Sequence, residues 1–298
     1  MQRRRFLQNT GLSLGLLALT DYKALADMIR QPAYKFIPLR NNVGIFTEQG
    51  GTIAWLSNKE GMVVVDTQFM DPAAHLIAEL KKKSEKPLKY LINTHHHGDH
   101  TGGNLAFKGL AEKVVAHQNC LINHQKTAAA QKSESKQLFA DTVFADKWKS
   151  KVGSENIKAH YFGAAHTNGD IIVHFEDANI AHMGDLMFNR RYPFIDRSAG
   201  ANIQSWIKVL DKAISEFDKD TLFVFGHSAD PEKVTGGKED LNAMQNYLEK
   251  LIAFVQSEIK SGKSKEEIMK ITGIPGAEDF QGQGIQRSLT AAYEELTI

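Results

Sequence analysis

The sequence predicts a mixed α/β fold, and two kinds of apolar pattern along its 298 residues support this prediction. Short apolar runs rich in Val, Ile and Phe recur between turn residues, which is typical of buried strands. Other stretches carry apolar residues at helical spacing, above all between residues 238 and 260. With 42% hydrophobic and 24% charged residues, the chain can bury a large core, organised as one or two domains.

Charge and cysteine content narrow the classes of function. The formal net charge is +1, which argues against a nucleic-acid-binding protein that depends on phosphate contacts. Cys120 is the only cysteine in the sequence, so neither an intrachain disulfide nor a thiolate-rich zinc site can form. We expect Cys120 to pack as a small apolar residue, and we expect a small molecule, not nucleic acid, as the partner.

Residues 1–26 resemble a twin-arginine export signal. Arg3 and Arg4 open the segment, a weakly apolar stretch covers residues 11–19, and Ala24-Leu25-Ala26 offers small residues for cleavage. The apolar stretch is too short to span a bilayer, and no cysteine follows it that could carry a lipid. We therefore expect an exported, periplasmic protein without a stable membrane anchor after signal removal. The alternative is a basic amphipathic helix that stays attached.

The next segment predicts three strands in a meander, because turn residues separate three apolar runs at the spacing of β-hairpins. A helix should follow from about Pro72 to Lys83, with Asp71 as its N-cap. Asp66 then ends the third strand as a carboxylate that is free for another role. The three runs are Val43–Thr47, Thr52–Leu56 and Met62–Thr67.

A dense group of ligand-type residues follows the apolar run Leu88–Ile92, which predicts a buried strand. Imidazole and carboxylate are the groups that bind zinc when thiolate is absent. Two histidines two positions apart on a turn can reach one metal, and the adjacent Asp-His pair can reach a second. The alternative is a polar loop whose histidines cap a helix or face solvent, but four ligand-type residues within six positions make it the poorer interpretation. The four are His95, His97, Asp99 and His100.

Five further runs predict strands, and three ligand-type residues lie in or next to them. His166 lies between two runs, Asp185 ends another, and His227 closely follows the last. A helix rich in alanine should cover residues 118–132, and residues 133–153 are polar and mixed. The five runs are Lys113–His117, Ile157–Tyr161, Ile171–Phe175, Asn179–Asp185 and Thr221–Phe225.

The last part of the chain predicts helices. Apolar residues at helical spacing indicate a long helix from about Lys238 to Lys260, and shorter patterns indicate helices at Lys265–Ile271 and Gln286–Leu296. We interpret residues 27–235 as the main domain and residues 236–298 as a helical extension packed on its core. The alternatives for this extension are a dimer contact or a lid over the substrate.

The stretch THHHGDHTGGN at residues 94–104 resembles the signature loop of the metallo-β-lactamase superfamily. The resemblance implies a four-layer αββα sandwich that binds two metals at one edge. The motifs GAAHTNGD, Gly184-Asp185 and Gly226-His227-Ser228 match the remaining ligand positions of that family, in order. The resemblance covers about residues 40–230. It also implies that Asp66 orients a ligand histidine without binding metal.

The resemblance also implies a ligand set and a reaction. His95, His97 and His166 would hold the first metal, Asp99, His100 and His227 the second, and Asp185 would bridge the two. Histidine at position 97 favours two Zn²⁺ ions per chain over the di-iron variant of the site. A hydroxide shared by the two zincs would attack a carbonyl carbon, with His95, His97 and Asp99 as the residues central to catalysis.

Lactams, lactones, esters and thioesters are the candidate substrates. Asp185 stands where true β-lactamases often have Cys or Ser, and the glyoxalase motif and the extra nuclease domain are missing. A β-lactamase proper, and a metal-binding accessory protein of a periplasmic redox system, remain alternatives. A mono-iron enzyme would not need His100 and His227.

Arg190, Arg191 and Tyr192 could bind a substrate carboxylate or form surface ion pairs. The pattern does not specify an oligomeric state.

Overall fold

A computed structural model describes residues 34–297 of the chain. The export signal predicted for residues 1–26 lies outside the described residues and stays a prediction. Among the described residues, 36–297 form one compact unit. Within the described part of the chain, no helix combines the length and the apolar character needed to cross a membrane.

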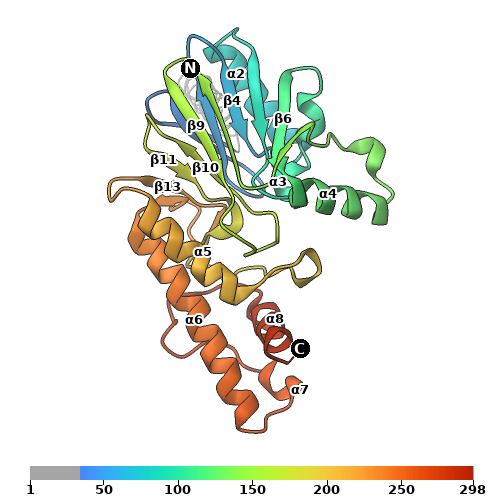
Figure 1. The fold of residues 1–298 in the computed structure, drawn as a ribbon, viewed down its shortest axis with the longest axis vertical. Coiled ribbons are helices and arrows are strands. Elements are labelled where there is room, and N and C mark those ends of the chain that lie inside the picture. The colour runs from blue at the N-terminus through green and yellow to red at the C-terminus, as the bar shows by residue number, and fades with distance from the viewer. Residues whose placement is uncertain (1–33, 298) are drawn as a thin grey trace, which may run out of the picture. The chain divides into compact units, whose positions relative to one another are not determined.

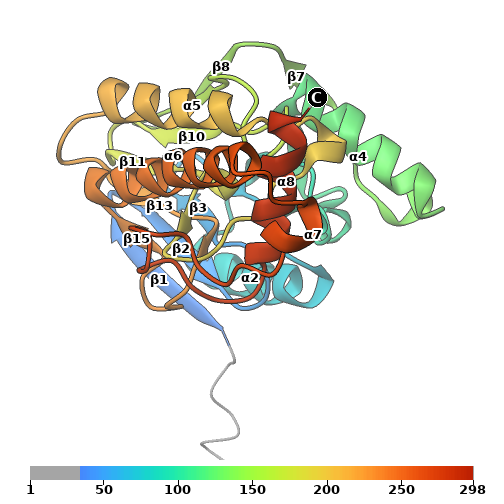
Figure 2. The same ribbon diagram turned by 90° about the horizontal axis from the view of Figure 1, so that it is seen from below.

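Two β-sheets form the centre of the fold, with helices outside them (Figures 1 and 2). The first sheet has seven strands in the order of the sequence. Its first pairs, from β2 to β4, are antiparallel, as the predicted meander requires, and β4 to β7 run parallel. Its strands are β1 (Lys35–Arg40), β2 (Val43–Thr47), β3 (Ile53–Ser57), β4 (Met62–Val65), β5 (Leu88–Ile92), β6 (Ala111–His117) and β7 (Thr142–Phe144).

The second sheet has six strands in the order β15-β13-β11-β10-β9-β8. Most neighbours are antiparallel, but β11 and β13 run parallel, so the loops that follow these two strands leave at the same edge. Its strands are β8 (Lys147–Val152), β9 (Glu155–His160), β10 (Ile172–Phe175), β11 (Ile180–His182), β13 (Leu222–Val224) and β15 (Thr235–Gly236); β12 (Phe188–Asn189) and β14 (His227–Ser228) form a separate pair.

The core between the sheets is built from β-branched and aromatic residues. Val65 and Ile92 of the first sheet belong to the same buried cluster as Val173, Phe175 and other residues of the second sheet. The parallel strand β4 is a continuous apolar run and is buried throughout, because both of its faces are covered. The neighbouring strand β5 is buried at Leu88, Leu91 and Ile92. The predicted αββα sandwich is therefore confirmed.

Helices α2 (Met70–Lys83) and α4 (Gln118–Ala130) belong to the part of the chain that forms the first sheet. The prediction that Asp71 caps α2 is wrong, because the helix starts at Met70 and Asp71 lies in its first turn. A carboxylate there still interacts favourably with the helix dipole. Helix α4 begins where predicted, and the His117 side chain caps it by accepting a hydrogen bond from the Asn119 N–H.

Four helices build a second core with the outer face of the second sheet. The sequence prediction omitted α5 (Ile203–Glu216), whose Trp206 is fully buried. Helix α6 (Lys238–Lys260) has the predicted bounds, while α7 (Lys265–Ile268) is shorter than predicted and α8 (Ile285–Leu296) starts one residue earlier. These C-terminal helices share their apolar core with α5 and the sheet.

Candidate metal centre

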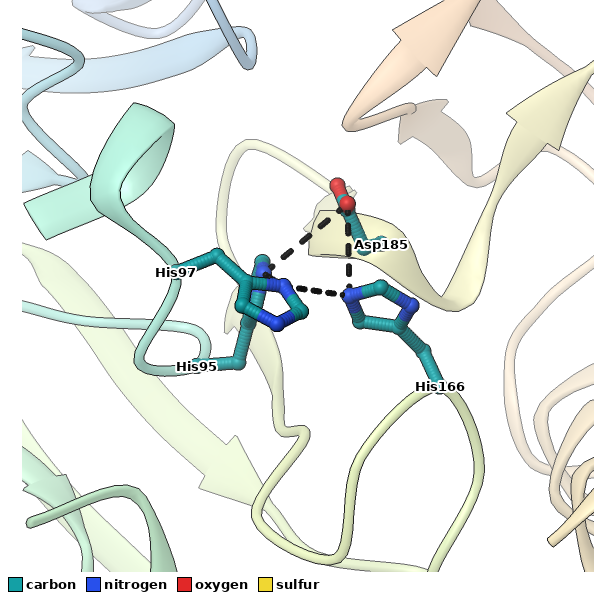
Figure 3. A group of neighbouring side chains, drawn as sticks. All are labelled: His95, His97, His166 and Asp185. Atoms are coloured by element: carbon teal, nitrogen blue, oxygen red, sulfur yellow. Dashed lines mark hydrogen bonds and ion pairs between the residues drawn. The ribbon is translucent and has the colours of Figure 1, made fainter. Parts of the chain in front are cut away.

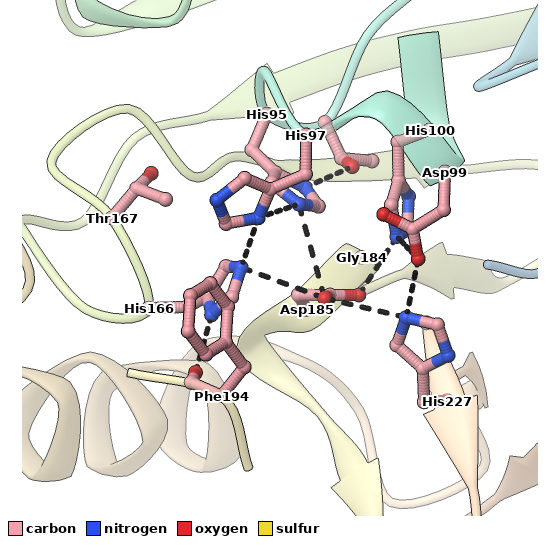
Figure 4. A network of polar contacts seen from close by, with 12 residues as sticks. His95, His97, Asp99, His100, His166, Thr167, Gly184, Asp185, Phe194 and His227 are labelled. Carbon is pink, nitrogen blue, oxygen red and sulfur yellow. Dashed lines mark hydrogen bonds and ion pairs between the residues drawn. The ribbon is translucent and has the colours of Figure 1, made fainter. Parts of the chain in front are cut away.

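All seven residues singled out in the sequence lie together at one edge of the sandwich (Figure 4). The loop after β5 carries His95 and His97, and the short helix α3 (Gly98–Thr101) carries Asp99 and His100. From the second sheet, the β9–β10 loop brings His166, the 3₁₀ turn after β11 brings Asp185, and β14 brings His227. Segments far apart in the sequence therefore converge because their strands end at the same edge.

The first group contains His95, His97, His166 and Asp185, whose ligand atoms all lie within 4.8 Å of one another (Figure 3). His97 Nδ1 lies 2.8 Å from His166 Nε2 and 3.1 Å from His95 Nε2. Three imidazole nitrogens thus face one point. Burial strongly lowers the pKa of His95 and lowers the pKa of His166 to about 4, so both rings are neutral at pH 7.

The outer ring nitrogens show which inner nitrogens carry lone pairs. His166 Nδ1–H donates to the Phe194 carbonyl oxygen at 2.7 Å, and His97 Nε2–H donates to Asp196 Oδ2 at 2.9 Å. The Thr94 hydroxyl donates to Asp66, which leaves its oxygen to accept from His95 Nδ1–H at 3.1 Å. With these outer nitrogens as donors, each of the three rings turns the lone pair of its inner nitrogen toward the centre. Three converging lone pairs repel each other, and a metal ion between them removes the repulsion. The residues therefore fit a metal.

The second group contains Asp99, His100 and His227, again with ligand atoms within 4.8 Å of one another. His227 Nε2 lies 3.1 Å from Asp99 Oδ2. Burial opposes the charged form of both histidines, but the charges of Asp185 and its neighbouring carboxylates raise the pKa of His100 strongly and that of His227 to about 9. The carboxylates in and around this group thus create a negative electrostatic environment that favours a cation.

Asp185 lies between the two groups. Its carboxylate oxygens are 3.5 Å from His166 Nε2 and 3.8 Å from His95 Nε2 on one side. On the other side they are 3.0 Å from His100 Nε2 and 3.4 Å from His227 Nε2. Burial acts against its charge, but the surrounding histidines hold its pKa well below the usual value. One carboxylate can therefore serve both groups.

Asp66 holds the ligand loop from behind, as the sequence resemblance implied. Its side chain is fully buried and accepts a hydrogen bond from the Thr94 N–H at 2.8 Å. Asp66 Oδ2 lies 2.7 Å from His100 Nδ1. This contact directs His100 Nε2 toward Asp185 and fixes which nitrogen faces the centre.

Sequence reasoning missed Phe194 and Asp196, which hold the outer nitrogens of His166 and His97. Both lie in the loop between β12 and α5, 28 and 99 positions from their partners. No fixed spacing marks such contacts, although an acidic residue in the loop that follows Asp185 was a possible signal. Asp196 also lies near His96, at 4.0 Å, and burial lowers the pKa of His96 to about 3.

Arg190 does not reach toward the centre as a substrate-binding residue. Its Nε lies 2.8 Å from Asp279 Oδ2, and its Nη2 lies 3.6 Å from Asp240 Oδ1. The ion-pair alternative therefore describes Arg190.

The strand histidine His182 is buried and donates to the Thr52 carbonyl oxygen at 2.8 Å, which links the two sheets.

Comparison with known proteins supports the fold and the family. The sequence profile of the metallo-beta-lactamase superfamily matches residues 47–227. The metallo-beta-lactamase IND-1 of Chryseobacterium indologenes is 24% identical over 199 residues, which cover 64% of this chain and 80% of that protein.

Two solved structures show the same fold. A metallo-beta-lactamase from Pontibacter korlensis superposes with a TM-score of 0.61 at 22% identity, covering 72% of this chain and 99% of that one. A double mutant of the sec-alkyl sulfatase PisA1 gives a TM-score of 0.67 at 14% identity, covering 89% of this chain and 50% of that one. Because the profile match spans more than half of the sequence, the protein belongs to the metallo-beta-lactamase superfamily.

Proposed function

We propose that the protein is a zinc-dependent hydrolase that holds two Zn²⁺ ions and cleaves a carbonyl substrate: a lactam, lactone, ester or thioester. The observation that carries the proposal is the convergence of three imidazole lone pairs beside Asp185. Neutral imidazole and carboxylate are ligands that suit zinc. In this proposal His95, His97 and His166 hold the first ion, Asp99, His100 and His227 hold the second, and Asp185 serves both.

Bound zinc would supply a Lewis acid and would lower the pKa of water toward about 7. The chain's own residues fix where this chemistry happens. Asp66 and Asp196 orient His100 and His97 by accepting their outer N–H groups. Burial opposes the charged form of Asp99, but His100 and His227 together lower its pKa to about 2. Asp99 is thus a carboxylate at neutral pH, which suits a ligand or a hydrogen-bond acceptor better than a proton donor.

The relatives' names leave more than one substrate class open. One is a metallo-beta-lactamase and another is a sec-alkyl sulfatase. Asp185 instead of Cys or Ser favours a hydrolase other than a β-lactamase proper. A metal-binding accessory protein would not need the complete ligand set that surrounds Asp185, and we therefore place catalysis first.

Zinc content and turnover, measured together, test the proposal. We expect two Zn²⁺ per chain after reconstitution, and hydrolysis of at least one member of a panel of lactams, lactones, esters and thioesters. Asp185→Asn keeps the side-chain shape but removes the charge shared by both groups. We expect this variant to bind the second zinc weakly. We also expect its turnover to fall by more than the ~10–100-fold that is typical when a residue that only supports a ligand is changed. Two tightly bound zincs with wild-type turnover in the variant would contradict the role of Asp185.

A further inference from the structure

An exposed aromatic ring lies beside the proposed metal centre. Phe194 is 40% exposed. Its ring centroid lies 5.4 Å from that of His97 and 5.9 Å from that of His166 (Figure 4). Its carbonyl oxygen accepts the His166 Nδ1–H. The backbone of Phe194 is therefore fixed, while its side chain offers an apolar surface directly beside the candidate ligands.

An arginine from the C-terminal helix α8 lies over this ring. The Arg287 guanidinium carbon is 5.9 Å from the Phe194 ring centroid, within the range of a cation–π contact. Helix α8 is held in place near this point, because the buried Ser288 hydroxyl donates to the Pro193 carbonyl oxygen at 3.0 Å. At its other end, Glu295 accepts hydrogen bonds from the Ile203 and Gln204 N–H groups of α5. Arg287 therefore projects from a rigid support.

The charge of Arg287 is not neutralised by the residues around it. Arg287 lines a groove of about 290 Å³ that also contains Arg197 and Glu294. Arg197 pairs with Glu295 at 3.1 Å, and Glu294 pairs with Lys265 at 3.0 Å. Among residues 34–297, no carboxylate pairs with Arg287. One guanidinium without a carboxylate partner thus remains beside the Phe194 ring.

We propose that Phe194 and Arg287 form a substrate subsite, and that the enzyme prefers carbonyl substrates in which an apolar segment separates the scissile bond from a carboxylate. The apolar segment would lie on the Phe194 ring, and the guanidinium would bind the carboxylate through two parallel N–H groups. This inference rests on the proposed hydrolase function. It also gives α8, which lies beyond the part matched by the superfamily profile, a role in substrate recognition.

The subsite explains why Arg190 is not needed for the same task. Arg190 is already paired with Asp279 and Asp240, and a substrate carboxylate would have to displace both. Arg287 needs no such exchange. Because the guanidinium is exposed, part of the attraction is screened by solvent and salt. We therefore expect Arg287 to raise the affinity for a substrate carboxylate about tenfold, which is less than the largest effects of buried charge pairs.

A matched pair of esters tests the subsite in the zinc-loaded full-length protein. The 4-nitrophenyl monoester of glutarate carries a free carboxylate, and its methyl ester is neutral but has the same glutarate spacer. We expect Arg287→Gln to raise KM about tenfold for the anionic ester and to leave the neutral ester within twofold. Arg287→Lys keeps the charge without the planar fork, so its KM should lie between the two. Lys219→Gln removes an exposed cation in the loop after the C-terminal end of α5 and serves as the control.

A binding measurement separates this proposal from the proposed function. Calorimetric titration with 4-phenylbutyrate and its uncharged amide gives the preference for the carboxylate even if neither ester is hydrolysed. If no ester is hydrolysed, that result contradicts the proposed hydrolase function. The difference in affinity between the carboxylate and the amide still tests the proposed subsite. Loss of this preference in Arg287→Gln supports the subsite. An unchanged preference, or equal weakening of both ligands, would overturn it.

Discussion

Four candidate ligand histidines, His95, His97, His100 and His166, use one nitrogen to face the centre and the other to hold their orientation. His166 is oriented by a backbone carbonyl, His97 by the side chain of Asp196, and His100 by Asp66. The histidines themselves were predictable, because their close spacing after a strand is a strong pattern. Phe194 and Asp196 were not, because their contacts depend on how a distant loop returns to the site.

Asp196 provides a prediction at this scale. Asp196→Ala removes the acceptor of the His97 Nε2–H, so the ring is freer to rotate and its inner nitrogen is less well aimed. We expect a loss of about 10–100-fold in affinity for the first zinc, measured by competition with a chromogenic chelator. Ser198→Ala is the control, because it removes the Ser198–Asp196 hydrogen bond but leaves the contact with His97. Equal zinc affinity in wild type and Asp196→Ala would show that His97 needs no such support.

The elements with a regular apolar pattern were predicted closely. Helix α6 has the predicted bounds, and β2 matches as well. Helix α5 was omitted although its sequence contains the signal: Asn202 caps it through the Ser205 N–H, and its buried residues recur at helical spacing. Strand β8 is harder to predict, because it is an edge strand that alternates lysine with half-buried residues. Edge strands of this kind resemble polar loops in sequence.

The turn between β2 and β3 shows what the sequence pattern alone could not reveal. Gly50-Gly51 predicts a tight turn, but the structure adds a second reason for glycine. A Cβ at position 51 would overlap the imidazole of His100, whose ring Asp66 holds from the other side. The close approach of this turn to α3 thus depends on the absence of a side chain.

Gly51→Ala should therefore damage one half of the centre. We expect His100 to be displaced, so that the second zinc is lost while the three histidines of the first group keep theirs. Zinc analysis after dialysis should give about one ion per chain instead of the two proposed. Gly273→Ala is the matched control, since a Cβ there would meet no atom within 4 Å. Two retained zincs in Gly51→Ala would mean that the turn can move away without cost to the site.

At the scale of the whole molecule, the two sheets meet in one core and in one site. Strands β4 and β5 of the first sheet and β11 and β13 of the second end at the metal centre. Contacts such as the Thr52 N–H with the Gly226 carbonyl oxygen, at 2.9 Å, join the sheets beside it. The layered arrangement was predictable only through the family resemblance, because apolar periodicity does not specify how two sheets pack.

Buried histidines away from the centre make the stability of the molecule depend on pH. His160 of β9 is only 5% exposed, and neither ring nitrogen has a hydrogen-bond partner among the described residues. Burial, together with repulsion from His174, lowers its pKa to about 4; Glu216 opposes the shift, and Lys147 and Lys158 add to it. In the unfolded chain the pKa of a histidine is about 6.5.

Acid should therefore weaken the fold partly through His160. Between about pH 6.5 and pH 4 the unfolded chain binds more protons at this position than the folded chain, so the free energy of unfolding falls as the pH falls. Protonation of the candidate zinc ligands adds to the loss, but equally in wild type and in variants that keep those ligands. We expect His160→Phe and His160→Gln, which differ in packing but both lack the titrating group, to show a smaller fall in melting temperature between pH 7 and pH 5 than wild type. If both variants lose as much stability as wild type over this range, His160 takes no part in the acid response.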